Sequence, residues 1–232
     1  NSLFSRDSTN FHSTVLLKNS ENIIPLKKLD TLKIATLNLS SNNLNSFEES
    51  CDNYTNIDHF HFNTFSSNRM IRAMEKELKG FNLIIINTDT IHFEIANLIH
   101  EISSKNKIIL NYVYGKKLFF EDLIINSCQA ILYNPKSKPK NLKHASQVIF
   151  GGLPCNNSLE NNLCKKYQSG DGLNSTKTRL SYLNPNELAI NDSILYKIDS
   201  IVNEGIDKHA MPGCQILAAK DGNVFFNKSY GN

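Results

Sequence analysis

The sequence predicts an α/β fold, a layered sandwich with a mainly parallel sheet, followed by the beginning of a second unit. Between residues 33 and 150, strand patterns and amphipathic-helix patterns alternate about five times. The run Asn82–Asn87 is almost continuously apolar, as expected of a strand covered on both faces. Helical patterns of roughly 10 to 15 residues separate such runs, and crossovers of that length connect parallel strands. This order of elements favours a doubly wound, flavodoxin-like sheet.

Each element is predicted from its own periodicity. Strands are expected from alternation or from apolar runs at Lys33–Leu39, Ile57–Phe62, Asn82–Asn87, Lys107–Val113 and Cys128–Tyr133. Helices are expected where apolar residues recur three and four apart, at Asn43–Tyr54, Thr64–Leu78, Phe93–Lys105, Lys117–Asn126 and Asn141–Phe150. Ser66 or Ser67 is a candidate N-cap of the second helix, and Gly80 and Gly151–Gly152 stand where C-caps are expected.

The stretch Phe11–Leu39 is expected to fasten the chain to this sheet and to start its first strand. Val15–Leu17 is a short amphipathic piece, and a polar turn and the apolar segment Ile23–Leu26 follow it. The strand-like run then begins at Lys33.

The regular pattern stops after Leu153. The following residues are rich in Asn, Ser, Gly and Lys, which is typical of a linker. A new unit then begins with a helix at Ile190–Ile206, capped by Asn191 or Asp192, and with strands Cys214–Lys220 and Asn223–Lys228 around an Asp-Gly turn. We therefore divide the chain into residues 1–155, a linker at 156–187, and a second domain at 188–232. One helix and one hairpin cannot bury a core, so this second domain is expected to be incomplete.

Composition excludes several function classes. The chain has 232 residues, 40% hydrophobic and 20% charged, and a net charge of +3, which gives no basis for nucleic-acid binding. No apolar run is long enough to span a membrane. No signal peptide is recognisable, and the first residue is Asn1 rather than Met. The five cysteines are scattered, without C-x-x-C pairs or zinc-site spacing, so we expect no metal and no cofactor.

Three short matches resemble a known family. Leu16–Asn19, Ile24–Leu26 and Lys33–Ala35 resemble the "LLKN…LPL…KIA" opening of the C-terminal α/β domain of family 3 glycoside hydrolases. Gln147–Pro154 resembles the end of that domain, where a helix ends in Phe-Gly and a proline follows. The closing GKLP of the family is replaced by Asn157–Glu160.

The tail resembles a second family. Met211–Ile216, Ala219–Gly222 and Ser229–Gly231 are similar to the opening of serine β-lactamase-related domains. Some bacterial proteins carry a family 3 β-N-acetylhexosaminidase barrel, its α/β domain and a β-lactamase-like domain in this order. The resemblance implies a barrel domain as partner, a carbohydrate as substrate of the parent enzyme, and a location in the periplasm or at the cell surface.

The resemblance assigns no catalytic residue to this chain. Retaining glycosidases use two carboxyl groups, and in family 3 the nucleophilic Asp lies on the barrel, as does the acid/base in the β-N-acetylhexosaminidase branch. In related β-glucosidases the α/β domain lends a Glu as acid/base. Glu48, Glu49 and Glu94 follow the first and third predicted strands and are candidates for that role. Their alternative role is that of solvated carboxylates on a helix face.

Two further motifs have both a functional and a structural explanation. Ser137–Lys140 spells the S-x-x-K of penicillin-recognising hydrolases, but Pro139 interrupts it in a polar loop. His59 and His61 share one strand face as a conceivable metal pair, but no Asp, Glu or third His is placed with them, which favours contact with neighbouring elements instead.

Two functions therefore remain open. The first is a non-catalytic accessory portion of a family 3 glycoside hydrolase, fused to a β-lactamase-like domain. The alternative is a flavodoxin-like ligand-binding module, in which the loops Asn38–Asn43 and Asn87–Thr90 form a crevice at the strand ends.

Overall fold

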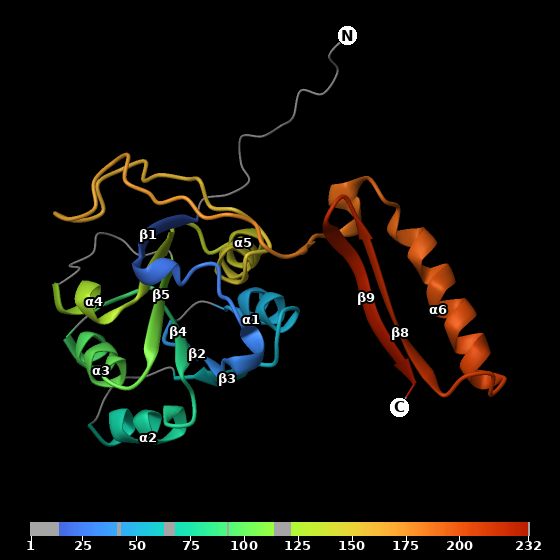
Figure 1. The fold of residues 1–232 in the computed structure, drawn as a ribbon, viewed down its shortest axis with the longest axis horizontal. Coiled ribbons are helices and arrows are strands. Elements are labelled where there is room, and N and C mark those ends of the chain that lie inside the picture. Colours follow the sequence, from blue (N-terminus) through green and yellow to red (C-terminus); the bar gives the residue numbers. More distant parts are fainter. Residues whose placement is uncertain (1–13, 41–42, 63–67, 92, 114–121, 232) are drawn as a thin grey trace, which may run out of the picture. The chain divides into compact units, whose positions relative to one another are not determined.

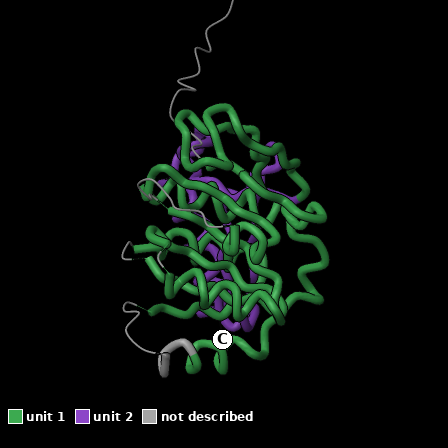
Figure 2. The backbone as a smooth tube through the Cα atoms, turned by 90° about the vertical axis from the view of Figure 1, so that its left-hand side faces the viewer, with its two compact units in different colours: residues 1–178 green, residues 179–232 purple. Residues whose placement is uncertain are grey.

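The computed structural model describes residues 14–40, 43–62, 68–91, 93–113 and 122–231. The chain divides into two compact units, residues 1–178 and residues 179–232, which Figure 2 draws in different colours. Each unit is described by itself.

The first unit is built around a six-stranded sheet. Its strands in chain order are β1 (Val15–Asn19), β2 (Ile34–Asn38), β3 (Asp58–His61), β4 (Leu83–Thr88), β5 (Lys107–Val113) and β6 (Ala130–Asn134). They lie in the order β1-β6-β5-β4-β2-β3, and all neighbours are parallel except β1, which runs antiparallel to β6. Counted along the chain, the five parallel strands have the order 2-1-3-4-5, which is the flavodoxin-like order. The predicted fold class is confirmed.

Among the described residues of this unit, five helices cover the two faces of the sheet (Figure 1). They are α1 (Asn45–Asp52), α2 (Asn68–Leu78), α3 (Phe93–Ser103), α4 (Asp122–Ser127) and α5 (Pro139–Phe150). Helices α1 and α5 pack against each other and share one apolar cluster with alternate residues of the strands, such as Ile85 and Ile109. Helices α2, α3 and α4 belong to a second cluster on the other face, with Ile84 and Ile108. Every residue of β4 is buried, as the apolar run predicted.

The opening stretch differs from the prediction, because Val15–Asn19 forms an antiparallel edge strand rather than a mere amphipathic piece. The side chain of Asn19 then fixes the following turn: its Nδ2 donates to the carbonyl of Ile24 at 2.7 Å, and its Oδ1 accepts from the Ile24 amide at 2.9 Å. The amide of Leu26 donates to the carbonyl of Ile149 at 2.9 Å. Ile24 and Leu26 are both buried, so this stretch is attached to α5 and the sheet by apolar packing as well as by hydrogen bonds.

Some of the predicted helix caps lie among the described residues and can be compared with the structure. Helix α5 ends at Gly151, whose φ of +80° is the left-handed conformation that suits glycine. Helix α6 (Asp192–Asp207) begins after Asn191, and the Asn191 side chain accepts a hydrogen bond from the Ser193 amide at 3.0 Å. The proposed caps Ser66 and Ser67, and the first residues of the helix predicted at 117–126, lie outside the described residues.

Residues 156–178, which the composition assigned to a linker, lie within the first unit. Leu159, Leu163 and Tyr167 are buried in the same apolar cluster as α2, α3 and α4. The backbone is tied down as well, since the Leu173 amide donates to the carbonyl of Leu16 at 2.7 Å. A polar average composition concealed these widely spaced apolar residues.

The second unit contains a short strand, a helix and the predicted hairpin. Its elements are β7 (Ser181–Tyr182), a 3-10 turn (Pro185–Leu188), α6 (Asp192–Asp207), β8 (Gly213–Lys220) and β9 (Asn223–Gly231). The strands form a sheet in the order β7-β9-β8. Asp199 on α6 accepts hydrogen bonds from Lys228 and Tyr230 of β9, at 2.7 and 2.5 Å. Large apolar side chains remain exposed, among them Ile194, Ile201 and Leu217.

Among the described residues, no helix has the length and apolar character needed to cross a bilayer.

The segment 156–178 provides a first test. Leu159→Ala should lower the free energy of unfolding of the first unit by about 2 to 4 kcal/mol, because it removes a buried side chain and leaves a cavity. Leu173→Ala is the matched control, since its side chain is 43% exposed and its loss should cost under about 0.5 kcal/mol. Urea unfolding of the two variants measures the difference, and equal midpoints would show that this segment is a linker after all.

Candidate functional site at the carboxyl edge of the sheet

The strand order reverses between β2 and β4, and their carboxyl ends meet there. In open α/β sheets this is where ligands bind. The Ser40 hydroxyl donates to Asp89 Oδ2 at 3.0 Å, and the Ser40 amide donates to Asn38 Oδ1 at 3.0 Å. The Leu39 amide donates to the carbonyl of Asn87 at 2.8 Å. The two strand ends are therefore fastened to each other by polar contacts on either side of the reversal.

A row of buried amides crosses the same edge of the sheet on the α1/α5 face. Asn111 Nδ2 donates to Asn87 Oδ1 at 2.8 Å, and Asn134 Nδ2 donates to Asn111 Oδ1 in a very short contact. The Thr14 hydroxyl donates to Asn134 Oδ1 at 2.6 Å, and His144 Nδ1 of α5 lies 3.0 Å from that hydroxyl. These five side chains are all nearly or fully inaccessible to solvent. We call them the amide relay, because each group donates to the next one along the sheet.

Two histidines of the edge strand β3 face two carboxylates of α1. His61 Nε2 lies 3.3 Å from Glu48 Oε2, and His59 Nε2 lies 3.0 Å from Asp52 Oδ1. On the other side of each ring, His59 Nδ1 lies 2.6 Å from the Thr36 hydroxyl of β2. The ring of His61 likewise has its Nδ1 3.5 Å from Asn38 Nδ2. Both imidazoles thus link helix α1 to β2, so contact with neighbouring elements accounts for the shared strand face.

Glu48 is the one of the three candidate carboxylates that lies inside the protein. Only 8% of the residue is exposed, and burial raises the pKa of its carboxyl group, while the nearby imidazoles of His61 and His59 lower it in part. The expectation of a solvated helix-face carboxylate is therefore wrong for Glu48. Glu49, the next residue on α1, is exposed, and Glu94 at the start of α3 is exposed as well.

Glu48 and the amide relay share one layer. His61, Asn38, Asn87 and Asn111 are direct register partners on four adjacent strands, so their side chains project on the same face of the sheet. Glu48 reaches this row from α1 through its contact with His61. We call the whole set the polar layer: Thr14, Asn38, Glu48, His61, Asn87, Asn111, Asn134 and His144.

The polar layer has no metal-ligand or phosphate-binding character. Among the described residues, no group of three or more His, Cys, Asp and Glu side chains could hold a metal ion. Phosphate-binding loops use glycine-rich backbone at a helix N-terminus, whereas the described strand-end residues 38–40, 43–44 and 87–91 contain no glycine. What the layer offers chemically is a carboxyl group with a raised pKa, beside an imidazole and a chain of amides.

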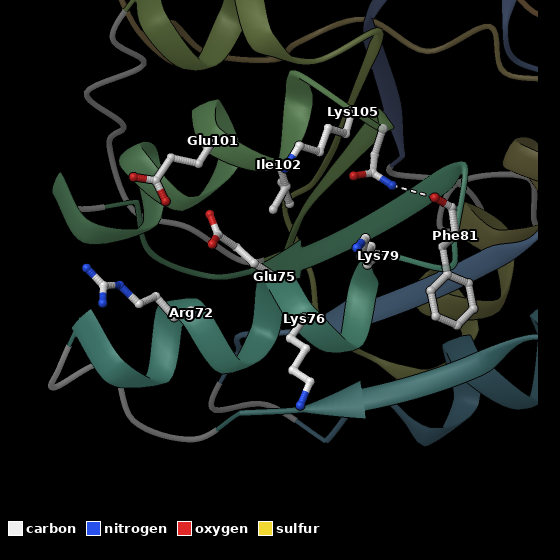
Figure 3. Close-up of a pocket in the computed structure, with 9 residues that line it drawn as sticks. Arg72, Glu75, Lys76, Lys79, Phe81, Glu101, Ile102 and Lys105 are labelled. Carbon is white, nitrogen blue, oxygen red and sulfur yellow. Dashed lines mark hydrogen bonds between the residues drawn. The ribbon is translucent and has the colours of Figure 1, made fainter.

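A hollow lies at the opposite, amino edge of the sheet, between the ends of α2 and α3 (Figure 3). It measures about 320 Å³, and its lining includes Lys79, Phe81 and Lys105. Figure 3 shows the carboxyl groups of Glu75 and Glu101 on facing helices. The neighbouring Glu75 carboxyl group is the main cause that raises the pKa of Glu101. This mixed, open surface contains none of the predicted site residues.

Sequence analysis missed the amide relay, although one signal of it was present. Asn111 interrupts the apolar run of β5, and Asn87 and Asn134 end the runs of β4 and β6. An Asn inside a fully buried strand needs hydrogen-bond partners for its amide. Similar residues at the ends of adjacent parallel strands are the obvious partners, because those ends lie side by side.

Comparison with known proteins places this fold. No protein-family model matches the sequence, and no curated protein matches it. Solved structures do match. The chain shares its fold with regions of glycosidases. A β-glucosidase from Listeria innocua matches with a TM-score of 0.50 at 13% identity, over 61% of this chain and 24% of its own length.

Two further structures agree. A β-glucosidase from Erythrobacter marinus matches with a TM-score of 0.53 at 12% identity, over 70% of this chain and 33% of its own. A fungal multi-domain GH3 β-N-acetylglucosaminidase matches with a TM-score of 0.50 at 16% identity, over 60% of this chain and 16% of its own. The matching regions of the Listeria and the fungal enzyme are C-terminal regions of family 3 glycosidases. This chain spans about a quarter of the Listeria enzyme, and at these identities the likeness concerns the fold.

The buried carboxyl group predicts a pH-dependent stability. Because the pKa of Glu48 is higher in the folded than in the unfolded chain, its ionisation destabilises the fold as pH rises from the unfolded pKa, roughly 4.3, through the raised one. Glu48→Gln removes this ionisation. The stability of wild type relative to Glu48→Gln should therefore be greatest in acid and fall toward neutral pH. Thermal unfolding between about pH 4 and pH 8 measures it. Glu49→Gln, exposed on the same helix, is the control, and an equal pH trend in both variants would contradict the burial of Glu48.

The amide relay provides a stability test. Asn111→Leu keeps the approximate size but leaves Asn87 Oδ1 and Asn134 Nδ2 without their partner, at a cost of about 1 to 3 kcal/mol for each buried group. Urea unfolding should show the combined loss. Asn53→Leu is the control, because the exposed Asn53 side chain donates to the carbonyl of Glu49 at the surface and its replacement should cost less than about 1 kcal/mol. Equal losses would mean that the relay is not formed.

Proposed function

We propose that residues 1–178 are the accessory α/β domain of a family 3 glycoside hydrolase, of the β-N-acetylhexosaminidase or β-glucosidase type. The observation that carries this proposal is the sheet: a 2-1-3-4-5 parallel core with an antiparallel β1 edge, matching regions of solved glycosidases. The resemblance of the opening stretch supports it independently; there the Asn19 side chain bonds to Ile24, and the Leu26 amide donates to the carbonyl of Ile149 on α5.

In this proposal the domain shapes a glycosidase site without carrying the reaction. Glycoside hydrolysis by retaining enzymes needs two carboxyl groups flanking the sugar bond. In the described part of the first unit the candidates do not form such a pair: Glu48 is buried against His61, and Glu49 and Glu94 are exposed on different helices. The partner is a barrel domain of the same polypeptide, which supplies the nucleophile and binds the β-linked carbohydrate. The protein acts outside the cytoplasm of a bacterium, in the periplasm or at the cell surface.

The second unit, in the same proposal, opens a serine β-lactamase-related domain. The support is the tail resemblance together with the structure of residues 179–232, where a helix lies beside a hairpin. Only Val202 and Val224 among its described apolar side chains are buried, so further polypeptide would be needed to complete a core.

The alternative function is that of a free-standing ligand-binding module. The observation favouring it is the strand reversal between β2 and β4, the usual ligand position in this fold. Against it, Ser40 and Asp89 bond to each other there, and an acidic side chain opposes phosphate. Titration of the chain with flavin mononucleotide, followed by absorbance, separates the two functions: tight binding supports the module, and unchanged spectra support the accessory role.

Turnover provides the direct test of the accessory role. The chain of residues 1–232 should release no nitrophenol from nitrophenyl β-N-acetylglucosaminide or nitrophenyl β-glucoside, whereas the complete product of its gene should cleave one of them. The expected contrast follows from the carboxyl groups, which do not form a catalytic pair here. Turnover by residues 1–232 alone, or a complete gene product without a glycosidase barrel, would contradict the proposal.

A further inference from the structure

The beginning of α5 and the loop before it concentrate positive charge. Four lysines lie within eight residues there, and we call them the lysine cluster: Lys136, Lys138, Lys140 and Lys143. The segment from Asn134 to Phe150 contains no Asp, Glu or Arg. Of the 25 Lys and Arg residues in the chain, the other 21 stand against 22 Asp and Glu residues. The lysine cluster therefore accounts for the net positive charge of the chain.

The members of the cluster are accessible and closely spaced. Lys136, Lys138 and Lys140 are exposed, and Lys143 is half-buried. Lys138 has an extended backbone, with φ of −66° and ψ of 144°, and it directly precedes the helix. Two residues of chain span at most about 7 Å, and three helical residues rise about 4.5 Å. Because charges are screened over about 8 Å in physiological salt, neighbouring lysines of the cluster act together on an anion.

The fold supplies no counter-charge for these lysines. Among the described residues, no ion pair involves Lys136, Lys138 or Lys143. On the neighbouring helix α1, Glu48 and Asp52 face the two histidines of β3 instead. Helix α5 has no acidic residue in its first turn and no side-chain hydrogen bond at its N-cap, so the positive end of its dipole adds to the lysines. Cations at a helix N-terminus destabilise the helix, so the stability of the fold does not explain the cluster.

The chemistry of the cluster suits a polymer with repeated negative charges. Lysine is a flexible point charge, whereas a bidentate grip on one phosphate or carboxylate is typical of arginine, which the segment lacks. Proteins that hold single-stranded nucleic acid combine basic with aromatic side chains. The aromatic residue of this segment, Phe150, is buried, as is His144. The large apolar side chains of α5 are buried too, so none of them is placed to enter a membrane.

We propose that the lysine cluster binds an anionic polysaccharide, whose sugar units carry carboxylate or sulfate groups. This inference rests on the proposed function, because a glycosidase domain meets carbohydrate polymers and the cluster selects the charged ones among them. The lysines contact separate anionic groups, and the N-terminus of α5 adds its positive potential. The cluster holds the polymer and takes no part in bond cleavage. The S-x-x-K spelling of Ser137–Lys140 then reflects this binding surface rather than a nucleophile.

Binding of residues 1–232 to immobilised polysaccharides tests the inference. Polygalacturonate presents carboxylates, dextran sulfate presents sulfates, and dextran is the neutral polymer. The chain should bind at least one of the charged polymers and not dextran, and binding should weaken steeply as salt rises. The charged polymer that binds more tightly identifies the preferred group. Replacement of all four lysines of the cluster by glutamine should weaken binding about tenfold or more, since four contacts are lost together.

The matched control changes the net charge equally at exposed positions elsewhere in the first unit. It replaces Lys27, Lys28, Lys165 and Lys166 by glutamine and should weaken binding no more than about twofold, because salt screens distant charges. The urea midpoint of the cluster variant should be unchanged or higher, which shows that it folds. Equal losses in the two variants, or tighter binding to DNA or to phosphatidylglycerol vesicles than to both charged polymers, overturn the inference.

Turnover separates this inference from the proposed function. In the complete gene product, the cluster variant should cleave the small, neutral nitrophenyl glycosides as fast as the wild type, because the cluster contacts only the charged polymer. Intact turnover without any binding of charged polysaccharide contradicts the lysine cluster alone. A complete gene product without a glycosidase barrel contradicts the proposed function.

Discussion

The need to satisfy buried amides governs the carboxyl edge of this sheet. Asn87, Asn111 and Asn134 lie on three adjacent strands and are inaccessible to solvent, so their polar groups must bond to one another or to groups on the covering helices. The donors all point the same way, from Thr14, which His144 contacts, through Asn134 and Asn111 to Asn87. A shift of one residue in any of these strands would turn its amide to the other face and break the row. The relay therefore fixes the register on which the apolar clusters on both faces depend.

The covering helices contribute the charged half of the same layer. Helix α1 places Glu48 and Asp52 opposite the two histidines of β3, an edge strand that would otherwise expose its outward polar groups. Because the histidines also contact Thr36 and Asn38, they join the edge strand to both its sheet neighbour and α1. The result is a polar carboxyl edge at which the described side chains of α1, β2 and β3 contact one another.

Helices and strands with a clear apolar periodicity could be predicted from the sequence. Features that arise from contacts between residues distant in the sequence could not. The strands β2, β4 and β5 and the helices α3 and α5 were placed within a few residues, because each has its own apolar pattern. The strand β1 was missed because its pairing with β6 lies more than a hundred residues away. The core residues Leu159 and Leu163 were hidden in a polar segment, and the burial of Glu48 follows from the distant His61 rather than from its helix. Asn111 alone carried a local signal, as a polar residue within a buried strand.

The most direct measurement of the central claim is hydrogen exchange of the asparagine side-chain amides, followed by NMR. If the relay holds the strand register, the amide hydrogens of Asn111 and Asn134 exchange only when the first unit unfolds globally, with a free energy equal to that from urea unfolding. The exposed amide of Asn53 exchanges within the dead time of the experiment. Exchange of Asn111 and Asn134 as rapid as that of Asn53 would contradict the account.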